Sequence, residues 1–242
     1  MPGEGPLRTT MPFVDVMTGM TATTAIMGAL YHRKGTSKGQ FVDVALLDVA
    51  FASAGPYAQT FLITGKAPER VGNCSTLFAP SNCFHCAGDG YILIQVGNEA
   101  QWRRLCDVLG RPDWAEDPRF AANASRVLNL QELHRQLDTM TRKRDARELA
   151  ATLGAADVPC GPVNTFAEAY DNPQVRHRGI RMEMDHPVHG PMSHVRSPLR
   201  FSDTPVRYRP APSLGADTTA VLQAELGFGD EALAKMKVKG VI

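Results

Sequence analysis

The sequence predicts an α/β protein in which a small α+β domain is inserted into a larger α/β domain. A helix, a turn, a strand and a second helix are expected in this order over residues 15–64, which is typical of a fragment of an α/β domain. Two apolar stretches flank Gly88-Asp-Gly90, and this pattern indicates a β-hairpin. Helical patterns return after residue 215. The length of 242 residues, with 43% hydrophobic and 21% charged residues, suits a globular protein with a sizeable core.

Charge and composition exclude several classes of partner. The formal net charge of +1 gives no reason to expect a nucleic acid or an acidic membrane surface. The longest apolar run, around residues 42–54, is interrupted by Asp43 and Asp48 and is too short to span a bilayer. No signal peptide pattern is visible. The five cysteines are odd in number and irregularly spaced, which favours a reducing compartment, so we expect a cytoplasmic protein without a membrane partner.

The first 70 residues supply the first part of the large domain. Residues 1–14 are rich in proline and glycine and predict a loop. From Asp15 to Arg33, small residues recur at near-helical spacing, which predicts a helix that packs closely against a neighbour. The predicted elements that follow are a turn at residues 34–39, a strand over the QFVDVALL stretch (residues 40–47) and a helix over residues 47–64.

The middle of the chain, residues 71–195, predicts the small α+β domain. Its hairpin has strands at residues 82–86 and 91–96, and the helix over residues 99–109 carries Trp102 and Leu105 on its apolar face. Further elements are expected as helices at 125–141 and 144–153 and as short strands at 181–184 and 192–195.

The tail, residues 196–242, is predicted to be a linker and two short helices, at 218–226 and 231–237, that return to the large domain. Residues 1–70 and 196–242 would then share one domain around the insertion at 71–195. That domain has one clear strand, whereas an open sheet usually has about five or six.

Asp15 is the main candidate for chemistry. It is expected at the start of a helix, where an N-cap carboxylate would accept a hydrogen bond from the backbone N–H of Met17 or Thr18. A carboxylate at this place could also act as a nucleophile, because free N–H groups at a helix start stabilise a developing oxyanion. Position alone leaves both interpretations open.

The other candidates favour structural roles. Asp43 and Asp48 fit a strand and a helix start, and Glu99 would complement the dipole of the helix it opens. Cys83-Phe-His-Cys86 has the spacing of half a zinc site, but no second pair of ligands follows, so no metal is expected. Cys160 has no base nearby in the sequence, and no glycine-rich phosphate loop is present.

Several stretches together resemble the class III CoA-transferases of the CaiB/BaiF type, the family that includes formyl-CoA and carnitine CoA-transferases. Their order and spacing cover essentially the whole chain. The matching stretches are PFVDVMTG (12–19), ALYHRKG (29–35), GQFVDV (39–44), DGYI (89–92) with Gln101-Trp102, DPRFAAN (117–123) with Arg126, VPCGPV (158–163) and PSLG (212–215) with Val221-Leu222 and Leu226-Gly227.

The resemblance implies that Asp15, in the "D-x-x-T/S-G" stretch, is the catalytic aspartate. In such enzymes it attacks an acyl-CoA to give an acyl-aspartyl anhydride, and the returning thiolate gives an aspartyl-CoA thioester from which a carboxylic acid takes the CoA. The substrates would therefore be an acyl-CoA and a carboxylic acid, with the CoA thioester as substrate and no separate cofactor. Asp15 would be both cap and nucleophile.

The resemblance also implies a long N-terminal segment that family members carry before this motif. That segment supplies most strands of a Rossmann-like domain and most contacts to CoA. The large domain here is therefore expected to be an incomplete Rossmann-like domain, with a separate chain as one source of the N-terminal half. The family forms interlocked homodimers, which would place the small domain over the partner's catalytic aspartate.

Two other functions stay open. Racemases of the same superfamily transfer a proton on a 2-methylacyl-CoA with a His/Asp pair, in which the Asp would again be Asp15, and a Glu near the position of Glu99 is also a family feature. Alternatively, the chain alone is not an enzyme and binds its missing N-terminal half, for which a large exposed apolar surface would be the sign.

Overall fold

A computed structural model describes residues 9–75 and 77–242 of the chain. They form two compact units, Met1–Val163 and Asn164–Ile242. The predicted division into residues 1–70, 71–195 and 196–242 stays a prediction, because the positions of the chain's parts relative to one another are not determined.

The first unit begins with three helices, α1 (Phe13–Thr36), α2 (Leu46–Ser53) and α3 (Gly55–Thr64). Helix α1 ends where Ser37 takes a left-handed conformation with φ of 58°, and its N–H donates to the Arg33 carbonyl at 2.8 Å. The single helix predicted over 47–64 is divided in two. Gly55 has φ of +47° and Pro56 cannot donate a backbone hydrogen bond, so the helix breaks at Ala54, between Ser53 and Gly55.

The strand predicted over residues 40–47 is absent, and this prediction was wrong. The chain is extended at Ala45, with φ of −106° and ψ of 142°, and α2 already begins at Leu46. A strand is defined by pairing with a neighbour, and the described residues before Ser75 contain no strand with which this segment could pair.

The sheet of the first unit is three-stranded and antiparallel, in the order β1 (Ser81–His85), β2 (Tyr91–Gln95) and β3 (Cys160–Pro162). The predicted hairpin is confirmed: Phe84 lies opposite Ile92, and the Gly88-Asp-Gly90 stretch joins the two strands. Ile92 and Ile94 are fully buried, whereas Tyr91, Leu93 and Gln95 are exposed. This alternation is the period-2 pattern of a sheet with one covered face.

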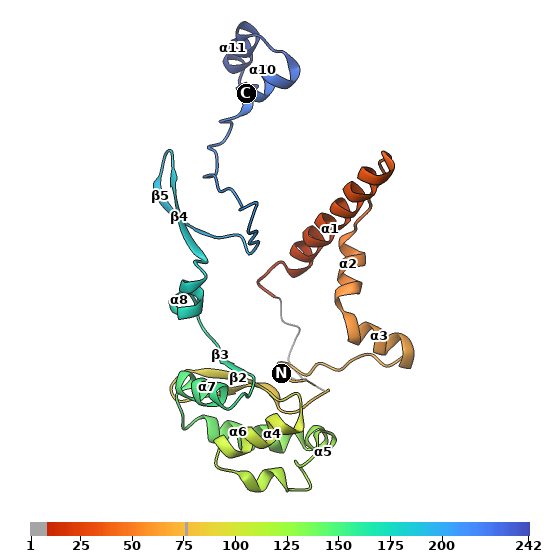
Figure 1. Cartoon of the computed structure of the whole chain (residues 1–242), viewed down its shortest axis with the longest axis vertical. Coiled ribbons are helices and arrows are strands. Elements are labelled where there is room, and N and C mark those ends of the chain that lie inside the picture. The colour runs from red at the N-terminus through yellow and green to blue at the C-terminus, as the bar shows by residue number, and fades with distance from the viewer. Residues whose placement is uncertain (1–8, 76) are drawn as a thin grey trace. The chain divides into compact units, whose positions relative to one another are not determined.

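Helices cover that face. They are α4 (Glu99–Val108), the 3₁₀ helix η1 (Pro112–Ala115), α5 (Asn123–Leu128), α6 (Leu130–Thr141) and α7 (Ala146–Ala155), of which α6 packs on β1 and α7 on β2 and β3 (Figure 1). The helix predicted over 99–109 is confirmed, and the one predicted over 125–141 is interrupted at Asn129. The core between helices and sheet contains Trp102 and Trp114, whose rings stack with centroids 6.3 Å apart.

Helix α7 is capped by Asp145, whose carboxylate accepts hydrogen bonds from the N–H groups of Arg147 and Glu148 at 2.9 and 3.0 Å. Asp145→Ala removes both bonds and is expected to lower the free energy of unfolding by about 1 kcal/mol. Chemical denaturation measures this change. Glu116→Ala, at an exposed position, is the control and is expected to stay within about 0.5 kcal/mol of the parent; an equal loss in both variants would contradict the role of the cap.

The second unit contains α8 (Phe166–Asp171), α9 (Pro173–His177), the antiparallel hairpin of β4 (Arg181–His186) and β5 (Gly190–Val195), α10 (Thr218–Leu226) and α11 (Asp230–Val238). The hairpin and both terminal helices agree with the predicted elements. A capping box starts α8: Thr165 accepts from the Glu168 N–H, and the Glu168 side chain accepts from the Thr165 N–H.

Helix α1 is the longest apolar helix of the described chain, rather than the segment around residues 42–54. It has 24 residues, an 18-residue window of it has a mean hydropathy of 1.3, which is enough by length and composition to cross a membrane, and none of its residues is buried. One such helix is a weak indication of a membrane span, because core helices of soluble proteins pass the same test.

Candidate active site

The start of α1 places Asp15 in the first helical turn. Pro12 is the N-cap residue, so the helix begins at Phe13 and Asp15 is its third residue. The prediction that Asp15 caps the helix was wrong, since no side chain caps α1. Proline fits this start because its fixed φ suits helix entry and its missing N–H would have no helical partner there.

The Asp15 carboxylate is exposed and receives no hydrogen bond from the described residues. The first N–H groups of a helix have no partner within the helix, and the helix dipole favours an anion close to them. Asp15 is therefore an accessible carboxylate, beside backbone donors that could stabilise negative charge on an attached acyl group.

A groove lies beside α1, between this helix, the extended segment that precedes α2, and α2 itself. Asp15 is not among its lining residues, which are Met17, Thr21, Asp43, Val44, Ala45, Asp48, Val49, Ala52 and Ser53. Two carboxylates, those of Asp43 and Asp48, are therefore present at the groove. The structure shows no contact between Asp15 and any other predicted site residue in the described part of the chain.

Glu99 belongs to a second polar centre, around the buried Arg126. The Arg126 side chain is 1% exposed and forms a two-pronged ion pair with the Glu99 carboxylate, with N–O distances of 2.7 and 3.1 Å. Its guanidinium also donates to the carbonyls of Ala79 and Phe120, and lies 4.8 Å from the centre of the Trp102 ring. The Glu99 side chain thus binds Arg126, a contact that was not predicted in addition to the expected interaction with the helix dipole.

Asn123 extends this centre to the loop that enters β1. Its N–H donates to Glu99, its side-chain oxygen accepts from the Ala79 N–H at 3.0 Å, and its side-chain nitrogen donates to the Leu77 carbonyl. Together, Asn123 and Arg126 bind both backbone groups of Ala79, which is fully buried. The sequence reasoning gave these two residues no role, although both lie in the DPRFAANASR stretch that carries the resemblance.

The ion pair makes stability depend on pH. The hydrogen bonds that the Glu99 carboxylate accepts from Arg126 hold the pKa of Glu99 below its ordinary value. A carboxyl group whose pKa is lower in the folded state stabilises that state above its unfolded pKa, and this contribution is lost as the pH falls through the folded pKa. The difference in free energy of unfolding between the parent and Glu99→Gln is therefore expected to be largest near neutral pH and to shrink below about pH 4.3. Urea titrations at several pH values measure this difference, and a pH-independent difference would contradict the ion pair as its source.

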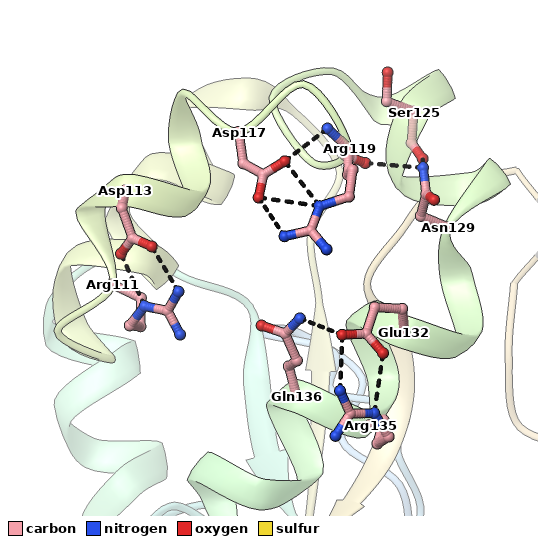
Figure 2. A network of polar contacts seen from close by, with 9 residues as sticks. All are labelled: Arg111, Asp113, Asp117, Arg119, Ser125, Asn129, Glu132, Arg135 and Gln136. Carbon is pink, nitrogen blue, oxygen red and sulfur yellow. Dashed lines mark hydrogen bonds and ion pairs between the residues drawn. The ribbon is translucent and has the colours of Figure 1, made fainter.

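Further ion pairs lie around this region at the surface, as Figure 2 shows. Asp117 pairs with Arg119 at 2.7 Å, Asp113 with Arg111 at 2.5 Å, and Glu132 with Arg135 at 2.8 Å. The Gln136 side chain also donates a hydrogen bond to Glu132. Exposed pairs of this kind contribute about 0–1 kcal/mol each. These arginines are all accessible to solvent, whereas Arg126, in the DPRFAANASR stretch, is buried.

The cysteines and histidines form no metal site among the described residues. His85, between Cys83 and Cys86, has its Nδ1 2.8 Å from an oxygen of Asp138, which in turn pairs with Arg142. Cys106 lies in the core, where burial raises the pKa of its thiol to about 12. Burial also raises the pKa of Cys160, which disfavours the thiolate that a nucleophile needs.

Comparison with known proteins gives the family. The model of CoA-transferase family III matches residues 1–218. The chain belongs to CoA-transferase family III. The exposed Asp15 and the Glu99–Arg126 centre are therefore features of a family III chain.

Named relatives of this family III chain include CoA-transferases with different substrates in their names. The succinate–glutarate CoA-transferase of Agrobacterium fabrum is 37% identical over 226 residues, which are 93% of this chain and 56% of the relative. The formyl-CoA:oxalate CoA-transferase of Bradyrhizobium diazoefficiens is 30% identical over 259 residues, 98% of this chain and 61% of the relative. The chain thus spans little more than half the length of the curated relatives it matches.

A solved structure of a CaiB/BaiF family protein from Brucella suis has a similar fold. The two superpose with a TM-score of 0.76 and 35% sequence identity, over 93% of this chain and 58% of the other. The mixed helix-and-sheet architecture of this family III chain is therefore that of its family.

Proposed function

We propose that this chain is the part of a family III CoA-transferase that carries the nucleophile, and that the nucleophile is Asp15. The observation that supports this most is the place of Asp15 in the family stretch Asp15-Val-Met-Thr-Gly19, exposed in the first turn of α1. The complete reaction is proposed for this chain assembled with the part of the family III enzyme that the chain does not match.

The reaction would proceed in four steps at this carboxylate. An oxygen of Asp15 attacks the thioester carbon of an acyl-CoA, the C–S bond breaks, and CoA leaves as the thiolate. The thiolate attacks the carboxyl carbon of Asp15 in the mixed anhydride, which releases the donor acid and leaves an aspartyl-CoA thioester. The acceptor carboxylate then attacks this thioester and displaces CoA. Finally, the thiolate attacks the acceptor's acyl carbon, which yields the new acyl-CoA and regenerates Asp15.

The two dicarboxylic acids in the name of the Agrobacterium relative give the first substrates to test. With 37% identity to a succinate–glutarate CoA-transferase, succinyl-CoA as donor and glutarate as acceptor are proposed ahead of formyl-CoA and oxalate. CoA enters as part of the substrate, so no separate cofactor is proposed. A cytoplasmic homodimer and a Rossmann-like large domain with the small domain inserted complete the proposal.

Proton transfer of the racemase type is not favoured. Glu99, which lies near the position of a glutamate that is a feature of these racemases, is bound to the buried Arg126 and to the Asn123 N–H. Arg126 stabilises the ionised form of this carboxyl group, which already accepts three hydrogen bonds.

Trapping of the intermediate tests the proposal. The chain, alone and with the complementary part of the Agrobacterium relative, is incubated with succinyl-CoA or formyl-CoA and quenched with hydroxylamine or borohydride. Peptide mass spectrometry is expected to find the modification on Asp15, with more of it from succinyl-CoA. An adduct only in the presence of the complementary part assigns activity to the assembled protein. Modification of other acids to the same extent, or of none, under both conditions would refute Asp15 as nucleophile.

A further inference from the structure

Three arginines of the second unit meet at one turn of the backbone. They are Arg178, Arg196 and Arg200, here named the arginine cluster, and all three are exposed. The turn joins α9 to β4 and contains Gly179, whose φ of +55° is a conformation that glycine adopts without strain. The Gly179 N–H donates to the Arg176 carbonyl at 2.9 Å, which closes the turn.

The chain that follows β5 brings two members of the arginine cluster back to this turn. The Arg196 N–H donates to the Ile180 carbonyl at 2.7 Å, so Arg196 lies beside the start of β4. One guanidinium nitrogen of Arg196 lies 3.6 Å from the position that a Cβ atom on Gly179 would occupy. The Arg200 guanidinium donates to the Arg178 carbonyl. Two guanidinium groups therefore lie against the backbone from which the Arg178 side chain also extends.

No member of the arginine cluster forms an ion pair within the described part of the chain, whereas the neighbouring arginines do. Arg176 pairs with Asp171 at 2.7 Å, and a nitrogen of Arg181 lies 3.9 Å from a carboxylate oxygen of Glu183. Asp203, three residues after Arg200, forms no ion pair with it. The turn therefore carries three positive charges that the described acids do not neutralise.

A hollow of about 470 Å³ opens at the same turn. Its lining includes Gly179 itself, Tyr170 and the two paired arginines, Arg176 and Arg181. Arg181 is held in place because its Nε donates to the Ser193 hydroxyl at 3.1 Å. The hollow offers room for a small anion, or for the group that carries it, next to the unpaired charges.

We propose that the arginine cluster is an anion site that takes a phosphate group. Each guanidinium presents a planar fork of donors that matches two phosphate oxygens. Three unpaired guanidinium groups at one turn repel one another, and a doubly charged anion among them offsets this repulsion better than a single carboxylate would. The proposal rests on the charges and geometry of the turn and not on the chemistry of Asp15.

Two sources supply a phosphate group of this chemistry. One is free inorganic phosphate, and the other is the phosphorylated nucleotide end of a CoA substrate. Inorganic phosphate and CoA are therefore the probes, pantetheine is the matched compound that lacks the phosphates of CoA, and glutarate is a small dianion without phosphate. A CoA affinity at least about tenfold above that of inorganic phosphate would assign the site to CoA, and equal affinities would assign it to free phosphate.

Calorimetric titration of the whole chain, in a buffer without phosphate, measures binding of each probe. One inorganic phosphate is expected to bind per chain with a Kd of about 1 mM or below, and glutarate at least about tenfold more weakly. Pantetheine is expected to show no binding that depends on the arginine cluster. The affinity for phosphate should fall as the salt concentration rises, because exposed charges are screened by salt.

Three variants that each remove one positive charge locate the site. Arg178→Gln and Arg196→Gln are each expected to weaken phosphate binding at least about tenfold. Neither side chain donates a hydrogen bond to another described residue, so the circular dichroism of both variants should match that of the parent. Arg33→Gln removes an exposed arginine of α1 that also has no ion pair among the described residues, and it should bind phosphate within about twofold of the parent.

Four results would overturn the proposal. They are the absence of saturable binding for both inorganic phosphate and CoA, binding of glutarate as tight as that of phosphate, binding of pantetheine that Arg196→Gln weakens as much as it weakens binding of CoA, and equal phosphate affinities of Arg178→Gln, Arg196→Gln and Arg33→Gln. Asp15→Ala is expected to bind phosphate like the parent. Failure of the proposed nucleophile would therefore leave the phosphate measurements unchanged, and the two failures are distinguishable.

Discussion

Asp15→Ala is expected to lower the turnover of succinyl-CoA and glutarate by about 10³-fold or more, measured on the chain assembled with its complementary part. The substitution removes the carboxylate that would form all the covalent intermediates, and no other described acid contacts this position. Because the side chain is exposed and makes no hydrogen bond in the described structure, the melting temperature should change little.

Asp48 provides a closely matched control. It is the third residue of α2, as Asp15 is the third residue of α1, and both side chains are exposed in the first turn of a helix. Asp48→Ala therefore makes the same change at an equivalent backbone position and is expected to keep turnover within about twofold of the parent. Equal losses in the two variants, or full turnover in Asp15→Ala, would reject the assignment of the nucleophile.

Arg126→Ala is expected to have the largest effect on stability, a loss of about 3–5 kcal/mol in the free energy of unfolding. The variant leaves the carbonyls of Ala79 and Phe120 without their donor in a region from which water is excluded. It also removes the planar cation from the face of Trp102 and the partner of Glu99. Urea denaturation followed by circular dichroism measures the loss.

Arg135→Ala is the control for this prediction. Arg135 also pairs with a glutamate, Glu132, but its side chain is 69% exposed (Figure 2). Its removal is expected to cost at most about 1 kcal/mol. Arg126→Lys keeps the charge but not the fork of donors, so its stability should lie between those of the parent and Arg126→Ala. A loss below about 1 kcal/mol in Arg126→Ala would show that the buried centre contributes little.

Local patterns made part of the fold predictable. The hairpin of β1 and β2 depends on the Gly88-Asp-Gly90 stretch and on alternating apolar residues, and both signals lie within about fifteen residues of the chain. The helix α4 likewise carries its own apolar face. Such elements were correctly predicted because the physical causes are close together in sequence.

The errors occurred where the cause lies elsewhere in the chain or outside it. The segment at residues 39–44 has the composition of a strand, but pairing needs a neighbour that no residue nearby can supply. The N-cap prediction for Asp15 assumed that a polar residue opens the helix, whereas the N-cap is Pro12, three residues earlier. The sequence therefore correctly predicted a carboxylate in the first turn of α1, but it did not predict which residue caps the helix.

The Arg126 centre could not be built from sequence patterns alone. Glu99 and Ala79 lie 27 and 47 residues before Arg126, so nothing local indicates that they meet. The only signal was the family stretch DPRFAANASR, which marked the region without indicating a buried arginine. Burial of such a charge depends on tertiary partners, which a linear reading does not reveal.

The stacked Trp102 and Trp114 rings determine which part of the protein intrinsic tryptophan fluorescence can report on. Trp102 and Trp114 are the two tryptophans of the chain, both are 1% exposed, and each has an arginine guanidinium over its ring. Tryptophan fluorescence therefore originates from the core under the β1–β3 sheet, and it follows the opening of that core to water. Asp15 lies on a part of the chain that contains no tryptophan, so a fluorophore has to be introduced there before a change at this carboxylate can be followed optically.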